Sequence, residues 1–301
     1  MTYTITPDEN DKEFLDRINW LPGHMIKSIR DIKKNISSVD IILEVRDARV
    51  PLVSGNSEIY DLCTDRPSLI VFNKANLADP EVIKLWKSWL VEKKESFIFV
   101  NALDKSSINQ IVKRSKEIAK AYQEKSNKSQ TAKKDLSMLI FGLPNTGKST
   151  IINKLSNRNA TKAAATPGQT KIKLWVKTDK GVQILDTPGV MPPVITHLEH
   201  AMWLSAIHAI PDHIITPEYS ACFLVEHLLK IKSSVFKDFY DFVDDQELGL
   251  VEALDHIGKK RGCVQSGGSC DYDRVYTIVL NDFRKGSLGL ISFELPPTGS
   301  D

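Results

Sequence analysis

The chain has 301 residues, of which 42% are hydrophobic and 26% are charged. These values are typical of a soluble globular protein of about two domains, and they exclude a collagenous chain, a mostly disordered chain and a small disulfide-rich scaffold. The 40 basic and 38 acidic residues give a net charge of +2, so any contact with nucleic acid has to come from local basic patches.

Several further classes of protein are disfavoured. No run of about 18 apolar residues occurs, so we expect no transmembrane helix. The cysteines Cys63, Cys222, Cys263 and Cys270 form no CxxC pair, so we expect no zinc site, and scattered thiols fit a reducing compartment. Residues 1–19 contain five acidic and two basic side chains, unlike a secretory signal or a standard transit peptide.

Short apolar runs alternate with helical patterns over the first two thirds of the chain. The runs typical of buried strands are 39–45, 68–72, 97–100, 138–141, 172–176 and 182–185. The helical patterns between them cover 81–93, 107–123 and 148–156. This alternation predicts an α/β fold with a mostly parallel sheet and helices on both faces.

The strand signal fades beyond residue 215. Three helical patterns follow it, at 218–232, 245–259 and 271–284. We therefore predict two domains, 1–214 and 215–301, of which the second is small and all-α. The end of the basic segment 105–134, from Glu124 to Lys134, is typical of an exposed linker.

The clearest chemical motif runs from Gly142 to Ser149 (GLPNTGKS), after an apolar run and before a helical pattern. This is the context of a phosphate-binding loop, or P-loop, in which glycines turn backbone N–H groups toward phosphate. Lys148 is predicted to contact the β- and γ-phosphates and Ser149 to hold Mg²⁺. The residues of this loop expected to contact nucleotide are Gly142, Pro144, Asn145, Thr146, Gly147, Lys148, Ser149 and Thr150.

Two further elements follow the P-loop. In Asp186-Thr-Pro-Gly189, the carboxylate is expected to position the metal through water, and the Gly189 N–H to sense the γ-phosphate. In Thr166-Pro-Gly-Gln-Thr170, a threonine is expected to close over Mg²⁺ when a γ-phosphate is present. Thr170 is the preferred candidate and Thr166 the alternative.

The predicted base-reading elements precede the P-loop. Asn73-Lys74-Ala-Asn76 follows one strand run, as NKxD does in GTPases, and Asn101-Ala102 follows the next, in the place of the guanine-binding Ser-Ala loop. The order of the GTPase motifs is therefore fourth, fifth, first, second, third. This order predicts a circularly permuted P-loop GTPase domain followed by a small helical domain.

Further motifs identify a family. They are Trp20-Leu-Pro-Gly-His24-Met25, Glu44-Val-Arg-Asp47-Ala-Arg49-Val-Pro51, Arg261-Gly-Cys, Gly267-Gly268 followed by Asp271-Tyr-Asp, and Asn281-Asp-Phe-Arg284-Lys-Gly286. Over nearly the whole chain after residue 19, the sequence resembles the circularly permuted ribosome-assembly GTPases of the YlqF/RbgA family. Within the family it looks most similar to the mitochondrial branch. Asp47 and Arg49 follow the first strand run and are expected to pair with each other or with a loop. They receive no chemical role beyond membership of their motif.

The resemblance implies hydrolysis of GTP to GDP with Mg²⁺, dependence on K⁺, and binding to the large ribosomal subunit through its rRNA. It also implies a monomer without a DNA partner. The mitochondrial branch implies the matrix, with peripheral contact to the inner membrane, and the cytoplasm is the alternative setting.

The residues that act on the attacking water are less evident. Val190 stands where many GTPases have a glutamine that orients the water. In the family this role is given to the histidine that corresponds to His24, and the alternative is that His24 packs a local turn. The expected catalytic set is therefore His24, Lys148 and Gly189. Asn145 corresponds to the family's K⁺ ligand, and the alternative is a hydrogen bond that stabilises the loop.

Asn76 departs from the family, which has Asp at this position. An amide offers guanine only one acceptor, so guanine selectivity is expected to fall about ten- to a hundredfold. GTP remains the expected nucleotide because Asn73 and Lys74 are present, and an ATP-using protein is the disfavoured alternative.

Segment 191–210 leads from the Asp186–Gly189 motif to the C-terminal helices, so a γ-phosphate-dependent shift is expected to move those helices. The candidate phosphate contacts on them are Lys259, Lys260, Arg261, Arg274, Arg284 and Lys285. For each of these the alternative is a solvated helix surface, and segment 105–134 is a second candidate surface. Two functions remain open: a GTPase activated by the large subunit, and a nucleotide-gated scaffold that rarely hydrolyses GTP.

Overall fold

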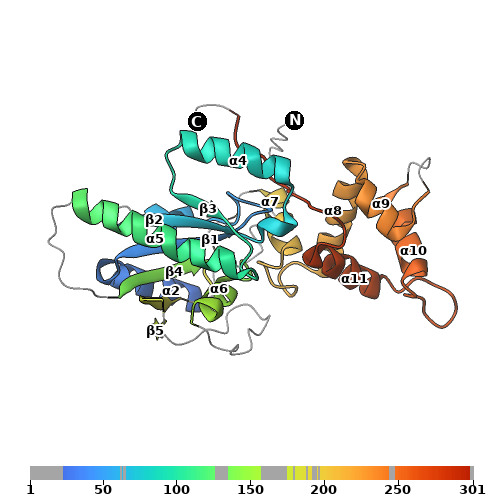
Figure 1. Cartoon of the computed structure of the whole chain (residues 1–301). Helices are drawn as coiled ribbons and strands as arrows, with labels where there is room; N and C mark the ends of the chain where they lie inside the picture. Colours follow the sequence, from blue (N-terminus) through green and yellow to red (C-terminus); the bar gives the residue numbers. More distant parts are fainter. Residues whose placement is uncertain are drawn as a thin grey trace.

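The protein has two lobes in the computed structural model (Figure 1). The structure describes residues 23–61, 63, 66–125, 135–156, 175–178, 180–187, 189–191, 195, 197–243 and 248–298. Within these residues six strands form a single sheet in one lobe, and helices α8 to α11 form the other.

The sheet has the strand order β3-β2-β1-β4-β6-β5, and only β5 runs antiparallel to its neighbour. The strands are β1 (Ile41–Asp47), β2 (Ser68–Asn73), β3 (Phe97–Phe99), β4 (Leu136–Gly142), β5 (Trp175–Lys177) and β6 (Val182–Asp186). All seven residues of β1 are buried, as expected for a central strand covered on both faces.

Helices cover both faces of the sheet, because successive residues of a strand point to opposite sides. Ile41 and Leu43 pack with α5 (Lys105–Lys125) and α6 (Lys148–Leu155). Ile42 packs on the other face, in a cluster that includes residues of α2 (Gly23–Asn35) and α7 (Leu198–Ala206). Helix α4 (Pro80–Glu92) covers the β2 and β3 end of that second face. The predicted mostly parallel α/β fold is confirmed.

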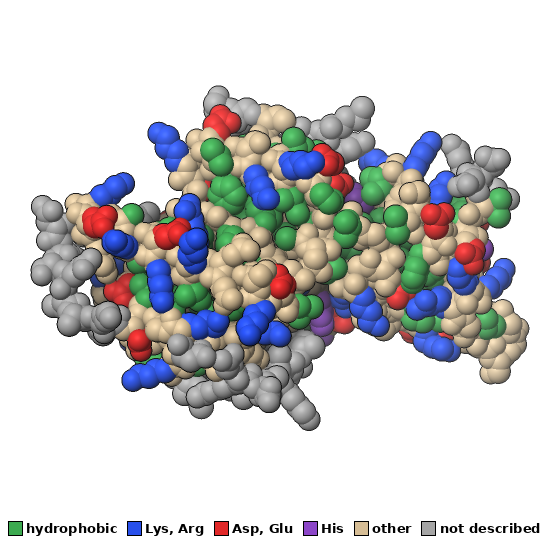
Figure 2. Space-filling model, viewed as in Figure 1, with side chains coloured by type: hydrophobic (Ala, Val, Ile, Leu, Met, Phe, Trp, Pro, Cys, Tyr) green, Lys and Arg blue, Asp and Glu red, His purple; other side chains and the backbone are tan. Residues whose placement is uncertain are grey.

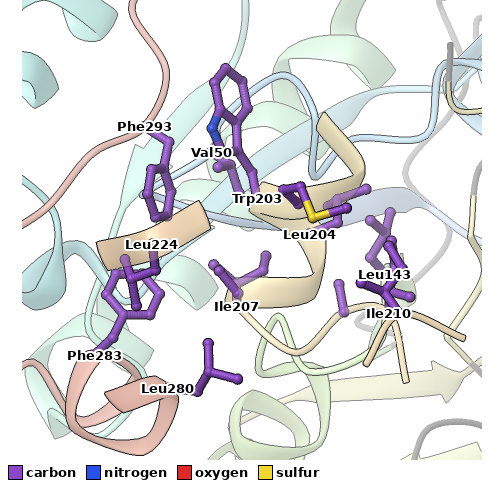
Figure 3. Packing of buried hydrophobic residues seen from close by; sticks show 14 of the residues in the cluster. Val50, Leu143, Trp203, Leu204, Ile207, Ile210, Leu224, Leu280, Phe283 and Phe293 are labelled. Carbon is purple, nitrogen blue, oxygen red and sulfur yellow. The ribbon is translucent and has the colours of Figure 1, made fainter. Parts of the chain in front are cut away.

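The helical lobe shares its core with the sheet. It contains α8 (Pro217–Lys230), α9 (Ser234–Tyr240), α10 (Leu250–Lys260) and α11 (Tyr272–Lys285). Buried residues form one cluster that runs from Leu143 through Trp203 and Leu204 of α7 to Leu224 and Leu280 (Figure 3). The last six residues of α7, 201–206, are all buried because the helix lies between the two lobes. The predicted boundary at 214/215 falls between α7 and α8, and it stays a prediction.

The predicted strands and helices are confirmed with shifted ends within the described residues, and residues 172–174 and 245–247 of two of them lie outside that part of the chain. Strand β1 begins at Ile41 instead of residue 39, and α10 begins at Leu250 instead of residue 245. The expectations did not include α2, α9 or the short helix α3 (Ser57–Asp61). Of the predicted linker, Glu124–Lys134, the first two residues are the end of α5, and residues 126–134 lie outside the described part. None of the described helices is both long and apolar enough to cross a membrane.

The C-terminal segment 287–298 runs from α11 across the sheet lobe toward α4 (Figure 1). The Ile291 N–H donates to the Leu77 carbonyl oxygen at 3.1 Å, and the Phe293 N–H donates to the Arg49 carbonyl oxygen at 3.0 Å. The Trp86 indole N–H donates to the Glu294 carbonyl oxygen at 2.9 Å. The segment therefore connects the two lobes.

Candidate functional site: a nucleotide-binding loop cluster

The candidate site lies where the parallel strands end. Asp47 and Asn73 are register partners at the ends of β1 and β2, and Val45 pairs with Gly142 at the end of β4. Asp186 ends β6. The carboxyl edge of a parallel sheet is the usual place of ligand binding in such folds, and the predicted P-loop, the Asn73–Asn76 motif and the Asp186–Gly189 motif meet there.

The P-loop connects β4 to α6, and two of its glycines are sterically required. A Cβ on Gly142 would lie 2.2 Å from the Val45 carbonyl oxygen, and a Cβ on Gly147 would lie 2.0 Å from the Asn73 Nδ2. Gly147 also has a φ of 101°, which side-chain-bearing residues rarely adopt. The loop is therefore packed directly against two neighbouring strand ends.

Lys148 begins α6 and is buried. Its ammonium group donates to the Leu143 carbonyl oxygen at 2.9 Å, and the Thr146 hydroxyl donates to the same oxygen at 2.9 Å. Burial lowers the pKa of Lys148 to about 8, although the nearby Asp186 carboxylate opposes this shift. Ser149 is exposed in the first helical turn and Thr150 is half-buried. A helix N-terminus with a lysine beside it is suited to bind phosphate.

Asn73 joins three loops that the sequence analysis assigned to nucleotide binding. Its amide Nδ2 donates to the Thr146 carbonyl oxygen of the P-loop at 2.8 Å. Its Oδ1 accepts from the Ala102 N–H at 2.9 Å. The Asn101 Oδ1 in turn accepts from the Leu103 N–H at 3.0 Å. One buried side chain thus fixes the Asn73–Asn76 loop against both the P-loop and the Asn101-Ala102 loop.

The next residue, Lys74, has the left-handed φ of 60°. Its ammonium group donates to the Asn145 carbonyl oxygen at 2.7 Å and forms an ion pair with the Asp47 carboxylate at 2.9 Å. Asn76 lies in a short 3₁₀ turn (Ala75–Leu77) and is exposed. The base-reading loop therefore contacts the P-loop through Asn73 and Lys74, while Asn76 faces solvent.

Asn145 has a φ of 57°, and its side-chain Nδ2 donates to the His208 carbonyl oxygen at 2.6 Å. The hydrogen bond expected under the alternative reading is therefore present. It uses the donor half of the amide, whereas a K⁺ ion would use the acceptor oxygen. His208 follows α7, so this bond also links the P-loop to the segment that leads to the helical lobe.

The Asp186–Gly189 motif lies against the P-loop. Burial raises the pKa of Asp186, and the Lys148 ammonium opposes this shift. A Cβ on Gly189 would lie 3.0 Å from the Pro144 nitrogen. The Val190 N–H donates to the Gly142 carbonyl oxygen at 3.2 Å, and Val190 is fully buried in the core. Residue 190 therefore has a packing role and cannot orient a water molecule.

Some predicted residues lie outside the described part of the chain. These include Thr166, Thr170 and residues 20–22. The backbone of His24 lies in the first turn of α2, and its side chain is outside the description. Their predicted roles stay predictions.

Asp47 pairs with Arg49, which is one of the two predicted alternatives, but the sequence analysis missed the second partner Lys74 and the contact of Arg49 with Phe283. Its carboxylate accepts from Arg49 Nε at 2.9 Å and from Arg49 Nη2 at 2.8 Å, and Arg49 lies over the Phe283 ring at 4.8 Å. The neighbouring cations Arg49 and Lys74 hold the pKa of Asp47 well below its usual range, against the opposing effect of burial. The signal for this network in the sequence was the presence of charged residues at the end of an otherwise apolar buried strand.

The sequence analysis also missed the contacts of the C-terminal segment. The Glu294 carboxylate accepts from the Leu52 N–H at 2.8 Å and from the Val53 N–H at 3.2 Å. The Asp79 N–H donates to the Ser292 hydroxyl at 3.1 Å. The segment therefore contacts both the loop after β1 and the end of the base-reading loop.

The basic residues of the helical lobe divide into two groups. Arg284 donates to the Ser205 and Ala206 carbonyl oxygens at 3.1 and 2.9 Å, so it closes the end of α7 and is a wrong choice for a phosphate contact. Lys260 pairs with Asp241, and Arg261 pairs with Asp282 at 3.2 Å. The remaining candidates are exposed: Lys259, Arg274 and Lys285. Figure 2 shows basic side chains on this lobe.

Comparisons with known proteins agree with this arrangement. Residues 137–239 match the family model described as "50S ribosome-binding GTPase". The chain is 35% identical over 279 residues to "Ribosome biogenesis GTPase A" of Bacillus pumilus, covering 93% of this chain and 99% of the relative. It is 31% identical over 269 residues to "Mitochondrial GTPase 1" of Aedes aegypti, covering 85% and 81%.

A solved structure is also similar. The crystal structure of GNP-bound YlqF from T. maritima matches with a TM-score of 0.60 and 25% identity, over 89% of this chain and 98% of that one. The expected family is thus confirmed, whereas the narrower likeness to the mitochondrial branch does not appear in the identities, which are higher for the Bacillus relative. The chain belongs to the YlqF/RbgA family of ribosome biogenesis GTPases.

Proposed function

We propose that this GTPase acts in assembly of the large ribosomal subunit, and that its GTP state controls how the helical lobe docks on rRNA. The observation that carries the proposal is the Asn73 side chain, which holds the base-reading loop, the P-loop and the Asn101-Ala102 loop together. The printed names of the relatives and of the family model support the ribosomal part.

The geometry favours one orientation of the nucleotide. The phosphates lie over the N-terminus of α6, where Lys148 exchanges its bond to the Leu143 carbonyl for phosphate oxygens. The base lies beside Asn73 and Lys74, with Ala102 on the adjoining loop. Gly189 contacts the P-loop at Pro144, so its N–H is close enough to respond to a γ-phosphate.

The residues present fit the expected cations. Mg²⁺ is usually bound through one or two protein oxygens together with substrate phosphates, and the exposed Ser149 hydroxyl and the Asp186 carboxylate supply such oxygens. Thr170 is the proposed third group. Asn145 fits K⁺, because its Nδ2 is already held by the His208 carbonyl and its oxygen is the ligating atom. When bound, Mg²⁺ and K⁺ would neutralise the charge of the phosphates.

Hydrolysis needs a group that orients the attacking water, and the buried Val190 cannot provide it. We assign this role to His24, whose imidazole can hydrogen-bond a water molecule. Replacing His24 with Ala is expected to lower subunit-stimulated GTP turnover at least tenfold, with little change in nucleotide affinity. Unchanged stimulated turnover in this variant would remove His24 from the mechanism.

The nucleotide state reaches the helical lobe through α7. The Asn145 side chain is bonded to the His208 carbonyl oxygen just after α7, and Arg284 of α11 is bonded to the carbonyl oxygens at the end of α7. A shift of the P-loop or of Gly189 on γ-phosphate binding therefore displaces a helix that both lobes contact. Lys259, Arg274 and Lys285 are the proposed rRNA phosphate contacts.

A second candidate function is a nucleotide-gated scaffold with little hydrolysis. The burial of Val190 favours it, because the motif after Gly189 supplies no side chain for water activation. In this case GTP binding alone sets the orientation of the helical lobe, and release of the subunit follows nucleotide exchange.

The deciding experiment measures GTP turnover in K⁺ buffer with and without purified large ribosomal subunits. A subunit-dependent rise supports the activated GTPase, whereas GTP binding without a rise supports the scaffold. Repeating the assay in Na⁺ tests Asn145, because equal rates in K⁺ and Na⁺ would exclude a K⁺ role. Competition with ATP and XTP tests whether the exposed Asn76 preserves preference for guanine.

For the compartment we propose the mitochondrial matrix, with peripheral contact to the inner membrane, and the cytoplasm is the alternative. The mitochondrial relative supports this setting, and the Bacillus relative supports a bacterial one. Large subunits from mitochondria and from bacteria, compared in the same turnover assay, separate the two.

A further inference from the structure

Asp47 is a fully buried carboxylate at the end of β1. It is neither part of the P-loop nor of the base-reading loop, and the proposed mechanism does not use it. A buried carboxylate needs charged partners to remain ionised. Asp47 has two such partners, Arg49 at 2.8 Å and Lys74 at 2.9 Å.

The sheet register places this carboxylate between the two halves of the nucleotide site. Strand β1 lies between β2, which leads into the base-reading loop, and β4, which leads into the P-loop. Asp47 is the register partner of Asn73, and Val45 is the partner of Gly142. The end of β1 is thus adjacent both to the loop that reads the base and to the loop that holds phosphate.

Lys74 has two oxygen partners in this arrangement. Its ammonium group donates to the Asn145 carbonyl of the P-loop at 2.7 Å and pairs with Asp47 at 2.9 Å. The lysine stem is long and has rotational freedom, so one partner alone leaves it several orientations. The second partner, a fixed carboxylate, restricts the ammonium group to the position that also reaches Asn145.

We propose that Asp47 is a positioning residue for nucleotide binding, which acts through Lys74 to fix the base-reading loop against the P-loop. The inference rests on the proposed function of this site as a guanine-nucleotide site. It assigns Asp47 no contact with the nucleotide. Arg49 completes the arrangement as the second cation, which holds the Asp47 carboxylate in place through two hydrogen bonds.

A neighbouring residue of the same strand provides a matched control. Glu44 is 1% exposed and forms an ion pair with Arg46, and its other oxygen accepts from the Asn56 N–H at 2.8 Å. Arg46 belongs to β1 itself and Asn56 to the loop after it, and neither belongs to the P-loop or the base-reading loop. Glu44→Gln therefore removes a comparably buried carboxylate charge without touching Lys74.

The experiment measures the Kd of fluorescent GDP and GTP for the full chain and for Asp47→Asn, Lys74→Gln, the double variant and Glu44→Gln. Circular dichroism at the assay temperature selects the variants that are folded. We expect Asp47→Asn to weaken both nucleotides at least tenfold and equally, because Lys74 belongs to the base-reading loop and GDP and GTP carry the same base. We expect Glu44→Gln to change the Kd less than twofold.

The double variant separates positioning from general destabilisation. If Asp47 acts through Lys74, adding Asp47→Asn to Lys74→Gln costs no further affinity. The double variant can still be compared with Lys74→Gln if Asp47→Asn alone does not fold. It removes one negative and one positive charge together, so it leaves no excess charge at this position. A further loss of affinity in the double variant, or equal losses in Asp47→Asn and Glu44→Gln, would overturn the inference. Absence of guanine-nucleotide binding by the unaltered chain would instead reject the proposed function.

Discussion

The nucleotide edge of the sheet is stabilised by polar contacts, whereas the helical lobe is stabilised by apolar packing. At the sheet edge, Asn73 and Lys74 each have defined polar partners in other loops. In the helical lobe, buried apolar residues such as Leu224 and Leu280 provide the contacts (Figure 3). Hydrogen bonds are directional whereas apolar contacts are not. A small change at the edge should therefore alter binding, and a small change in the lobe should alter stability.

The largest effect on binding is expected for Gly147→Ala. The new Cβ would lie 2.0 Å from the Asn73 Nδ2 and would force the two loops apart, so we expect loss of measurable GTP and GDP binding in a fluorescence titration. Gly267→Ala is the control, because Gly267 also has a positive φ, 121°, but open space around it. Comparable loss in both variants would mean that backbone strain, not the loop contact, determines binding.

Leu224→Ala tests whether a change in the helical lobe alters stability and leaves nucleotide binding unchanged. Leu224 is fully buried in α8, so we expect the free energy of unfolding to fall by about 2–5 kcal/mol. The Kd for GDP should stay within about twofold at a temperature where the variant is folded. Leu85→Ala, at a 52% exposed position of α4, should leave both quantities nearly unchanged. A large loss of GDP affinity in folded Leu224→Ala would show that the lobe core also tunes the site.

A pH effect is expected at Glu294, where the two regions meet. Burial raises its pKa from 4.5 to about 7, although the Leu52 and Val53 N–H groups oppose the shift. The folded protein then binds a proton that the unfolded chain has lost, so stability is full below pH 4.5 and falls as the pH rises to 7. The loss is at most about 3 kcal/mol.

Thermal unfolding between pH 5 and 8 checks this expectation. Glu294→Gln cannot ionise, so its melting temperature should depend less on pH than that of the unaltered protein over this interval. Parallel pH profiles for the two proteins would assign the dependence to other groups.

The smallest effect concerns the surface of the helical lobe. Replacing Lys259, Arg274 and Lys285 with Gln should reduce the slope of log affinity against log salt for ribosomal subunits by about 2, because each phosphate contact contributes about 0.7–0.9. The matched control replaces Lys84 and Lys87 of α4 and Lys93, which directly follows it, with the same loss of charge. Equal slopes for the two triple variants would show that total charge matters and the lobe surface does not.

Much of the fold and of the nucleotide loops could be predicted, because their signals are local. Apolar runs identify buried strands, and the spacing of Gly142, Gly147 and Lys148 is confined to eight consecutive residues. The order of the motifs indicated that the base-reading loop precedes the P-loop. The structure then places these loops together through Asn73.

The unpredicted features depend on contacts between distant residues. Asp47 acquires its partner Lys74 only because β1 and β2 are neighbours in the sheet. Arg284 is a surface cation by sequence pattern, yet it is bonded to carbonyl groups 78 and 79 positions away. A helical pattern shows which side is polar, but it does not show which polar groups another element will cover.

The C-terminal segment determines when some native hydrogen bonds can form during synthesis. The Leu52 and Val53 N–H groups receive their acceptor from Glu294, which is 242 and 241 residues later in the chain. At about 5–20 residues per second, translation takes roughly 12 to 48 s to supply that acceptor. Until then, the loop after β1 lacks the hydrogen bonds of Leu52 and Val53 to Glu294, although the P-loop has already been synthesised.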